Sequence, residues 1–341
     1  MSTPTSDDPS DYSGNIDPKI LEALEGLPSD FVGFPRVFQE HVQPELRRRE
    51  GERQSSARRA VQTTWLGGLI AVIGLILGLF IFRAPPFALV TVIVGIGVIG
   101  AGRAPLNRLA REAKALIVEP VAKQFELDYT AKPGRVPTAL VIQEAGLLPS
   151  WNRSSYEDHM TGERNGVSFE FFEAHLEKQR TTRERSGRTR TRWVTLFRGQ
   201  CLRFAFHKRF HGRTLVLRDA GIMNRFGSVT DLQRARLESP DFEDAFEVYT
   251  SDQVEARYLL TPDLMQRLVE LEKTFRGGSL RCSFVDGQLQ IVLEGADLFE
   301  PGSMFTPLDN PDRIRELLDD FAAVFNLIDS FEEPRALQNR D

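Results

Sequence analysis

Two long apolar runs, separated by one charge, dominate the hydrophobic pattern of the chain. Thr64–Phe82 and Ala84–Gly102 are each 19 residues long and uncharged, with Arg83 between them and Pro85-Pro86 just after it. A helix rises about 1.5 Å per residue, so each run nearly covers the ~30 Å hydrocarbon core of a bilayer. Because proline cannot continue a helix, the pattern predicts a transmembrane helical hairpin at 64–102, with spans at 64–82 and 84–102. A buried helix pair in a soluble core is the alternative.

Amphipathic segments flank this hairpin on both sides. Upstream, apolar residues recur at spacings of three and four: Phe34, Val37, Phe38, Val42 and Leu46. Downstream the same spacing recurs: Leu106, Leu109, Ala113, Leu116 and Val121. This period is that of one helix face. It predicts an amphipathic helical segment at 19–63 and an amphipathic helix and linker at 103–135, packed together as an antiparallel stalk, with a break or kink at Pro120.

The pattern changes after residue 136 to a period of two. The alternating runs are 168–171, 202–206, 280–284 and 289–293, and they predict strands with one buried face. Asp286-Gly287 lies between the last two runs and is a strong hairpin signal. Helices are predicted at 137–148, at 262–275 with Thr261 as its cap, and at 309–331. The fold class predicted for 136–331 is therefore α+β with mainly antiparallel strands.

Composition separates the two ends of the chain from the rest. The 341 residues are 41% hydrophobic and carry a net charge of −5, which excludes a disordered chain, a collagen and a multi-span transporter. Residues 1–18 are rich in aspartate and proline, so we expect a disordered acidic tail there. Residues 332–341 are expected to form a flexible C-terminal tail.

The positions of the basic residues predict the orientation of the hairpin. Ten of them lie within 20 residues of its outer ends: Arg47, Arg48, Arg49, Arg53, Arg58, Arg59, Arg103, Arg108, Arg111 and Lys114. The turn contains only Arg83. Since cytoplasmic flanks carry an excess of lysine and arginine, both termini and the α+β domain are expected in the cytoplasm.

Glycine is frequent in both apolar runs. Gly74 and Gly78 in the first, and Gly97 and Gly100 in the second, are the candidate helix-packing residues. They would pack the hairpin on itself or, alternatively, against other copies in a homo-oligomer. Neither run contains aspartate, glutamate, lysine or histidine, which favours an anchor over a transporter.

A basic stretch between two strand patterns is the candidate binding site. It carries seven cations and one acid, Glu184: Lys178, Arg180, Arg183, Arg185, Arg188, Arg190 and Arg192. A solvated hairpin tip is one interpretation. The functional one is a surface for anionic lipid headgroups, which attract basic residues by about 1 kcal/mol each. No aromatic residue is interleaved between 178 and 192, so nucleic acid is not expected.

The sequence contains only weak signals for catalytic or metal-binding sites. His207 and His211 are four apart, but a turn signal at Gly212 argues against the helix that a metal pair would need. Tyr156-Glu157-Asp158-His159 is more typical of a loop with surface pairs than of an acid–base site. Cys201 and Cys282 are isolated, and the phosphate-binding, nucleophile-elbow and metalloprotease motifs are missing. We therefore predict no catalytic residue, no metal and no cofactor.

The order of several motifs resembles a bacterial membrane-protein family catalogued as domain of unknown function 3137 (DUF3137). The motifs are Tyr156-Glu157-Asp158 with Gly162, residues 166–169 with Glu173, Phe197-Arg198-Gly199, Phe210 with Gly212-Arg213-Thr214, and residues 238–243, 246–249, 253–262 and 297–300. The resemblance covers most of 35–331. It implies an anchored protein of a bacterial inner membrane with a cytoplasmic domain and no assigned activity, and it suggests a LemA-type membrane protein as a partner.

Two functional hypotheses follow. The first is a membrane-anchored cytoplasmic binding or scaffolding domain, not an enzyme, that contacts anionic lipid or a protein partner. The second is an unrecognised enzyme with a cleft in the α+β domain lined by Glu157, Asp158, Arg257 or Tyr258. Convergence of these side chains on one pocket would favour the enzyme.

Overall fold

The computed structural model describes residues 22, 31, 33–81, 83–183, 189–218, 231–274, 279–300 and 302–331. The tails predicted at 1–18 and 332–341 lie outside them. The chain divides into two compact units, here called the helical unit (1–124 with 299–321) and the sheet unit (125–298 with 322–341). The sequence placed 299–321 with the sheet, and it began that domain at 136, eight residues after the first strand begins at Asp128.

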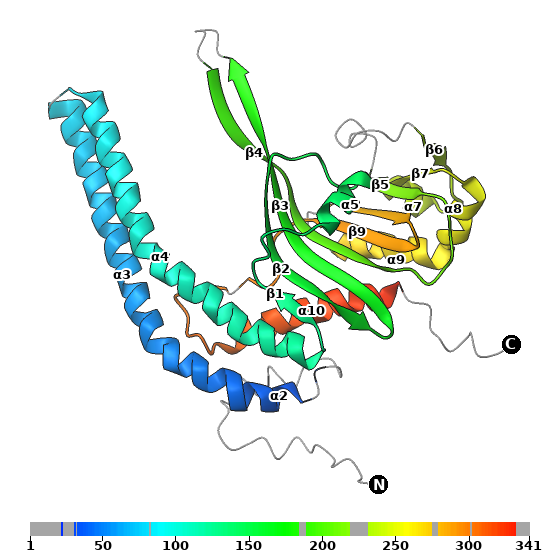
Figure 1. Ribbon diagram of the computed structural model, residues 1–341. Helices are drawn as coiled ribbons and strands as arrows, with labels where there is room; N and C mark the ends of the chain where they lie inside the picture. The colour runs from blue at the N-terminus through cyan, green and yellow to red at the C-terminus, as the bar shows by residue number, and fades with distance from the viewer. Residues whose placement is uncertain are drawn as a thin grey trace. The chain divides into compact units, whose positions relative to one another are not determined.

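Two long helices form most of the helical unit, and each continues from an amphipathic segment into an apolar run (Figure 1). The first runs without interruption from Phe34 to Ile81 through α2 (Phe34–Val37), η3 (Phe38–Val42), α3 (Gln43–Ile76) and η4 (Leu77–Ile81). The second is α4 (Pro85–Gln124), and Pro105 and Pro120 lie inside it. The helix is not broken at Pro120, so the prediction of a break there is wrong. Buried neighbours such as Val118 and Val121 hold the helix together where the proline removes a backbone hydrogen bond.

The amphipathic parts of these helices supply the core of the helical unit. The fully or nearly buried side chains include Phe34, Phe38, Val42, Leu46, Leu106, Leu109, Ala113, Ile117, Val118 and Val121. Eight of the ten residues that the three-to-four spacing singled out are buried, whereas Val37 and Leu116 are only partly buried, and Ile117 and Val118 were missed. A salt bridge between Arg49 Nη1 and Glu112 Oε2, at 2.5 Å, joins the two helices beside this core.

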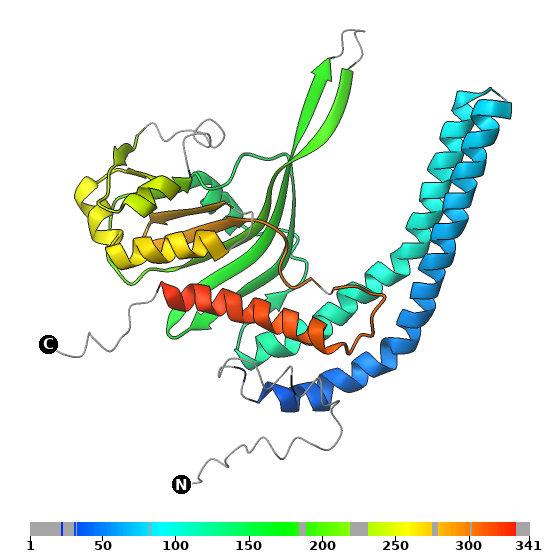
Figure 2. The ribbon, with the colours of Figure 1, turned by 180° about the vertical axis from the view of Figure 1, so that it is seen from behind.

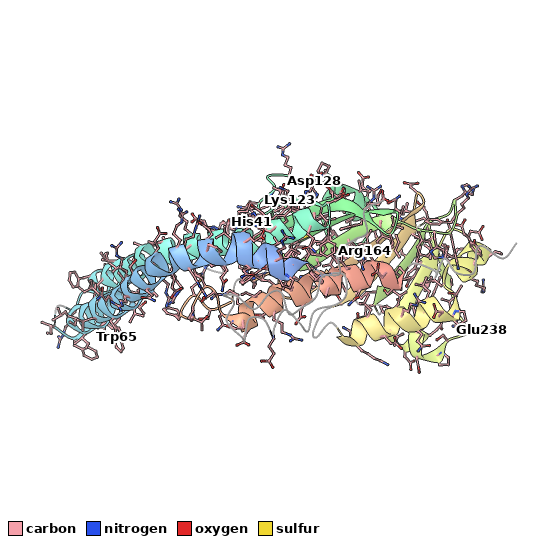
Figure 3. All side chains as sticks on the ribbon, turned by 90° about the horizontal axis from the view of Figure 1, so that it is seen from below. His41, Trp65, Lys123, Asp128, Arg164 and Glu238 are labelled. Carbon is pink, nitrogen blue, oxygen red and sulfur yellow. The ribbon has the colours of Figure 1, made fainter. Side chains whose placement is uncertain are left out.

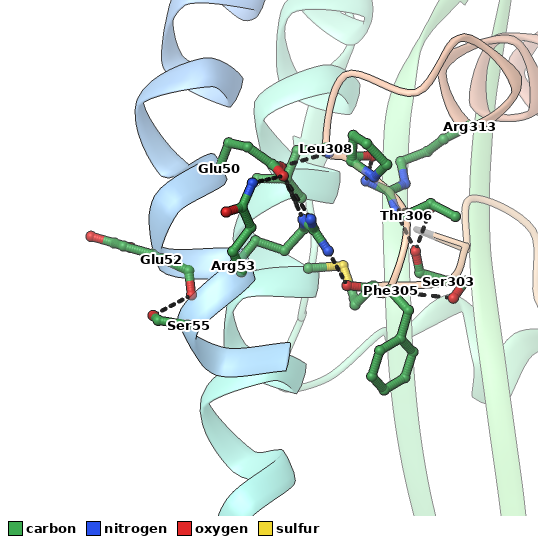
Figure 4. A network of polar contacts seen from close by, with 12 residues as sticks. Glu50, Glu52, Arg53, Ser55, Ser303, Phe305, Thr306, Leu308 and Arg313 are labelled. Atoms are coloured by element: carbon green, nitrogen blue, oxygen red, sulfur yellow. Dashed lines mark hydrogen bonds and ion pairs between the residues drawn. The ribbon is translucent and has the colours of Figure 1, made fainter. Parts of the chain in front are cut away.

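Residues 302–310, within the helical unit, form a strap that is fixed to α3 by polar contacts (Figure 4). Arg53, which is 7% exposed, donates to the carbonyl oxygen of Met304 at 3.0 Å and pairs with Glu50 at 2.6 Å. Glu50 in turn accepts the backbone N–H of Leu308 at 3.1 Å. On the other side, Arg313 donates to the carbonyl oxygens of Ser303 and Pro307. Residues about 250 apart in sequence are thus joined, which no local pattern could predict.

Among its described residues, the sheet unit contains a nine-stranded sheet in which every pair of neighbours is antiparallel, in the order β1-β2-β3-β4-β9-β8-β5-β7-β6. The strands are β1 (Asp128–Thr130), β2 (Arg153–Arg164), β3 (Val167–Arg183), β4 (Thr189–Ala205), β5 (Thr214–Arg218), β6 (Gln233–Ala235), β7 (Phe246–Thr250), β8 (Leu280–Val285) and β9 (Gln288–Glu294). The predicted antiparallel α+β class is confirmed.

Helices accompany the strands. They are α5 (Thr138–Glu144), α7 (Pro240–Ala245), α8 (Gln253–Leu259), α9 (Pro262–Thr274) and α10 (Pro311–Ser330), whose second half belongs to the sheet unit. Thr261 caps α9 by accepting the N–H of Leu264 at 3.4 Å, and Asp286 and Gly287 form the β8–β9 turn with φ angles of 52° and 72°. Both local signals in the sequence were therefore interpreted correctly.

The prediction of a single buried face is wrong for the central strands. In β8 and β9, residues of both faces are buried. On one face, α5 contributes Ala139 and Ile142 to a core that includes Phe172 and Val292. Figure 2 shows α9 and the second half of α10 over the other face, where Phe331, just after α10, contacts the ring of Phe204. The polar residues of the alternation are accommodated by pairing, as when Ser283 donates to Gln290 at 3.2 Å.

Candidate membrane anchor and basic ribbon

The apolar part of the helical hairpin is exposed. Both helices are long and apolar enough to cross a membrane, yet only 17% and 11% of their most apolar windows are buried. Trp65 and Phe80 are 78% and 77% exposed, and Figure 3 shows the Trp65 side chain projecting outward from the hairpin. Other exposed side chains continue this surface: Leu66, Leu69, Val72, Ile73, Ile76, Leu79, Ile81, Leu89, Val90, Ile93, Val94 and Ile96. A core helix of a soluble protein would bury such residues.

Small residues allow the two helices to approach closely. A Cβ atom at Gly67 would lie 2.5 Å from the carbonyl oxygen of Gly95, and one at Gly78 would lie 2.7 Å from the Cβ of Ala88. A side chain at Gly74 would overlap that of Thr91. Larger residues at these points would force the helices apart.

The four glycines singled out from the sequence divide into two pairs. Gly74 and Gly78 face the opposite helix, whereas a Cβ at Gly97 or Gly100 would meet nothing within 4 Å. Gly95 and Gly102, which contact the first helix, take the packing role in α4. The three-to-four spacing alone did not distinguish the inner from the outer glycines.

Basic residues are concentrated at the end of the hairpin that lies away from the turn. Some of the basic residues are neutralised locally, as Arg49 and Arg108 are by Glu112. Four exposed arginines within ten residues of the outer ends of the apolar runs make no ion pair with the described residues: Arg58, Arg59, Arg103 and Arg111. At the other end the chain turns through Arg83, whose φ of 50° is left-handed, and the N–H of Ala84 donates to the Gly78 carbonyl oxygen at 2.7 Å.

The second candidate site is the two-stranded extension of β3 and β4, here called the basic ribbon (178–183 and 189–194). It projects beyond the rest of the sheet (Figure 1), since β2 pairs with β3 only up to Glu177 and β9 pairs with β4 only from Gly199 onward. Nearly all its side chains are exposed. Residues 184–188, with Arg185 and Arg188, lie outside the described residues.

The register of the ribbon determines which side chains share a face. Arg180 lies directly opposite Arg192, Thr182 opposite Arg190, and Lys178 opposite Val194. Because side chains alternate between faces, Lys178, Arg180, Arg190 and Arg192 lie together on one face. The other face carries Gln179, Thr181, Arg183, Thr189, Thr191 and Trp193.

The base of the ribbon is fixed by contacts on the second face. The guanidinium of Arg153 pairs with Glu177 and lies 4.9 Å from the ring centroid of Trp193. Thr181 and Thr191 oppose each other with hydroxyl oxygens 3.4 Å apart. These pairs order the ribbon without using any of the four cations on the first face.

A small polar pocket lies elsewhere in the sheet unit. It has a volume of about 120 Å³ and is lined by Ser155, Glu157, Glu173, Ala174, His175, Arg198 and Asp297. Glu173 accepts the backbone N–H of Leu298 and an N–H of Gln200. Its burial, reinforced by the nearby Asp158, raises the pKa of this carboxyl to about 9. In the sequence, the position of Glu173 between the apolar residues Phe172 and Ala174 could have indicated a buried carboxyl group. The sequence analysis assigned no chemical role to it.

The residues of the enzyme hypothesis do not meet in this pocket. Glu157 lines it, whereas Asp158 is fully buried at a β-bulge, where Tyr129 donates to it at 2.7 Å. Arg257 lies on α8 and donates to the carbonyl oxygens of Gln253 and Arg236. Tyr258, on the same helix, lies against the ammonium group of Lys208.

The histidines and cysteines considered as metal ligands or reactive groups make packing and backbone contacts instead. The ring of His207 lies against that of Phe206 at an angle of 46°, while the backbone N–H of His211 donates to Glu255. Cys201 and Cys282 are fully buried, which raises the pKa of both thiols. Within the described ranges, no group of three or more potential ligands could hold a metal ion.

Fold and exposed hairpin together define an α+β protein with two helices that could cross a membrane. Residues 195–333 match the family described as "Protein of unknown function (DUF3137)", so this part of the chain is similar to that family. The match confirms the resemblance stated from the sequence motifs over residues 195–333. None of the curated proteins compared with the chain matches it.

One solved structure shows a weak likeness, the crystal structure of the mycobacterial trehalose monomycolate transport factor A, TtfA. It matches 66% of this chain and 97% of that chain, with 7% sequence identity and a TM-score of 0.34. A likeness at this level assigns neither a fold nor a function to the chain.

Proposed function

We propose that this protein is an integral membrane protein whose hairpin anchors a non-enzymatic binding domain on the cytoplasmic face of a bacterial inner membrane. The observation that carries the proposal is the exposed apolar surface around Trp65 and Phe80. Solvating this surface in water would cost about 25 cal/mol per Å², whereas a bilayer accommodates it. The close glycine contacts make the two helices one compact insertion unit.

The distribution of charge supports the orientation. Arg58, Arg59, Arg103 and Arg111 flank the apolar runs without an ion pair among the described residues, and lysine and arginine are retained on the cytoplasmic side during insertion. The hairpin turn, with Arg83 alone, would then reach the opposite surface. Both chain ends and the sheet unit would be cytoplasmic.

The basic ribbon is the proposed contact surface of the sheet unit, and anionic membrane lipid is the partner that its charge fits best. A protein partner in the same membrane, such as a LemA-type protein, and a homo-oligomer formed through the outward Gly97 and Gly100 are further proposals. The scattered positions of Glu157, Asp158, Arg257 and Tyr258 give the enzyme hypothesis no shared site.

Alkaline carbonate extraction of membranes containing the full chain tests the anchor. The protein is expected to remain in the membrane pellet. A variant with Leu75→Arg and Ile93→Arg, at outward positions in the two spans, is expected to be released, while exposed Val254→Arg on α8 is the matched control and should stay. Release of the unaltered protein with soluble proteins would overturn the proposal.

A further inference from the structure

The four cations of the first ribbon face are held in an arrangement that disfavours the unliganded state. Like charges directly opposite each other on neighbouring strands repel, and Arg180 and Arg192 are such a pair. The side chains of Arg180, Arg190 and Arg192 make no ion pair or hydrogen bond with the described residues. Lys178 has only a long contact with the Ser150 hydroxyl, at 3.4 Å.

The second ribbon face differs in composition although it has the same exposure. Its only cation among the described residues is Arg183, next to Thr189. Threonine and glutamine side chains cover most of this face, and Trp193 holds its base against Arg153. The positive charge of the ribbon is therefore directed to one side, which a net count of basic residues does not reveal.

We infer that the face of Lys178, Arg180, Arg190 and Arg192 is a binding face for the phosphate groups of anionic phospholipids. Opposite side chains on paired strands lie about 5 Å apart at Cβ, so one phosphate group fits between the Arg180 and Arg192 guanidiniums. Each guanidinium offers a planar fork of donors that matches phosphate oxygens. The phosphate removes the repulsion within the pair, and Lys178 and Arg190 attract the neighbouring headgroups.

Other anions fit this face less well. Single-stranded nucleic acid needs aromatic side chains beside the cations for its bases to stack on, and the one aromatic residue of the ribbon, Trp193, lies on the opposite face. A bilayer surface presents many phosphates in a plane, as a flat and exposed ribbon face requires. This inference rests on the proposed function, because it takes the lipid surface as the partner of the ribbon.

Flotation of the full chain, held in nanodiscs of neutral phosphatidylcholine, with added vesicles tests the inference. Vesicles containing phosphatidylglycerol are expected to carry the protein upward, and pure phosphatidylcholine vesicles are not. Arg180→Gln and Arg192→Gln should each weaken binding about fivefold, the factor for ~1 kcal/mol per basic residue. Arg183→Gln, with the same charge change on the second face, should weaken it less than about twofold.

A charge-swap variant separates the effect of the face that carries the cation from the effect of the total charge of the ribbon. Gln179→Arg with Arg180→Gln moves one cation to the second face at constant net charge, and binding is expected to fall as it does in Arg180→Gln alone. Equal weakening by Arg183→Gln and Arg180→Gln, or full binding of the swap variant, would overturn the face-specific inference and leave lipid binding by the ribbon intact.

Two further outcomes concern the ligand. Flotation that does not depend on phosphatidylglycerol would overturn both this inference and lipid as the proposed partner, while carbonate extraction would still decide the anchor independently. Displacement by soluble glycerol phosphate, at matched ionic strength, would show that a free phosphate is the ligand and would overturn the assignment to lipid. We expect no displacement, because a single soluble phosphate lacks the neighbouring headgroups.

Discussion

The backbone N–H of Leu298 donates a hydrogen bond to the carboxyl group of Glu173, 125 residues earlier in the chain. Glu173 is 3% exposed, and its burial raises the pKa to about 9, with Asp158 and Asp297 adding to the shift. The folded protein therefore holds this carboxyl in its neutral form near neutral pH. The segment after β9 is fixed to the sheet by that contact.

The pKa of Glu173 predicts a pH-dependent stability. In the unfolded chain this carboxyl would titrate near its ordinary value of 4.5, so between that pH and about 9 the unfolded state has lost a proton that the folded state keeps. The free energy of unfolding contributed by this group then decreases as the pH rises through that window. Glu173→Gln stays neutral and is expected to raise the melting temperature at about pH 8 and to change it little at about pH 5. Thermal unfolding followed by tryptophan fluorescence measures both.

Glu170, also on β3, provides a control because its pKa is shifted in the opposite direction. Burial acts to raise its pKa, but hydrogen bonds from His159 and Thr138 outweigh this and leave the pKa lowered. Such a group stabilises the fold above its unfolded pKa and loses that contribution as the pH falls. Glu170→Gln should therefore lower the melting temperature at neutral pH. If Glu173→Gln lowered the melting temperature at about pH 8, as Glu170→Gln should, the assignment for Glu173 would be wrong.

Packing of the apolar helices depends on the inner glycines. Gly74→Leu and Gly78→Leu are each expected to destabilise the hairpin by roughly 1–3 kcal/mol, because the added side chain has to displace Thr91 or Ala88. Gly97→Leu, at an open position, is the matched control and should have little effect. Titration with sodium dodecyl sulfate, followed by circular dichroism, gives the unfolding midpoints. Equal midpoints for Gly74→Leu and Gly97→Leu would contradict the helix packing.

The attachment of the strap of 302–310 to α3 should depend on Arg53. Arg53→Met leaves Glu50 partly buried without its cation, a type of change that costs about 3–5 kcal/mol, and it removes the bond to the Met304 carbonyl oxygen. Hydrogen exchange at the Leu308 amide is expected to accelerate strongly. Arg48→Met, which breaks only an exposed pair with Glu45, is the control, and unchanged Leu308 exchange in Arg53→Met would disprove this role.

The orientation of the hairpin is open to a direct measurement. A reporter that is active only in the cytoplasm should give signal when fused to either end of the chain. The variant Arg83→Cys should react with an impermeant thiol reagent added from the side of the membrane opposite the cytoplasm, since the turn is expected there. Activity of a C-terminal reporter that works only outside the cytoplasm would refute this orientation.

Elements defined by local physics were predictable. The three-to-four spacing around Phe38 and Leu109 fixed the buried helix faces, because helical geometry brings such residues onto one side. Asp286-Gly287 determined its turn through the left-handed backbone that both positions adopt. Two uncharged runs of 19 residues likewise specify a hairpin of the right length for a bilayer.

Tertiary structure decided the features that depend on pairing between distant segments. Whether a glycine packs inward, as Gly74 does, or outward, as Gly97 does, depends on the rotation of one helix against the other. The burial of Glu173 and the attachment of Leu308 to Glu50 join residues that no local period relates. The sequence by itself determined that the ribbon is basic. Only the strand register, which sets the residues that stand opposite each other, placed Arg180 and Arg192 together and Arg183 on the other face.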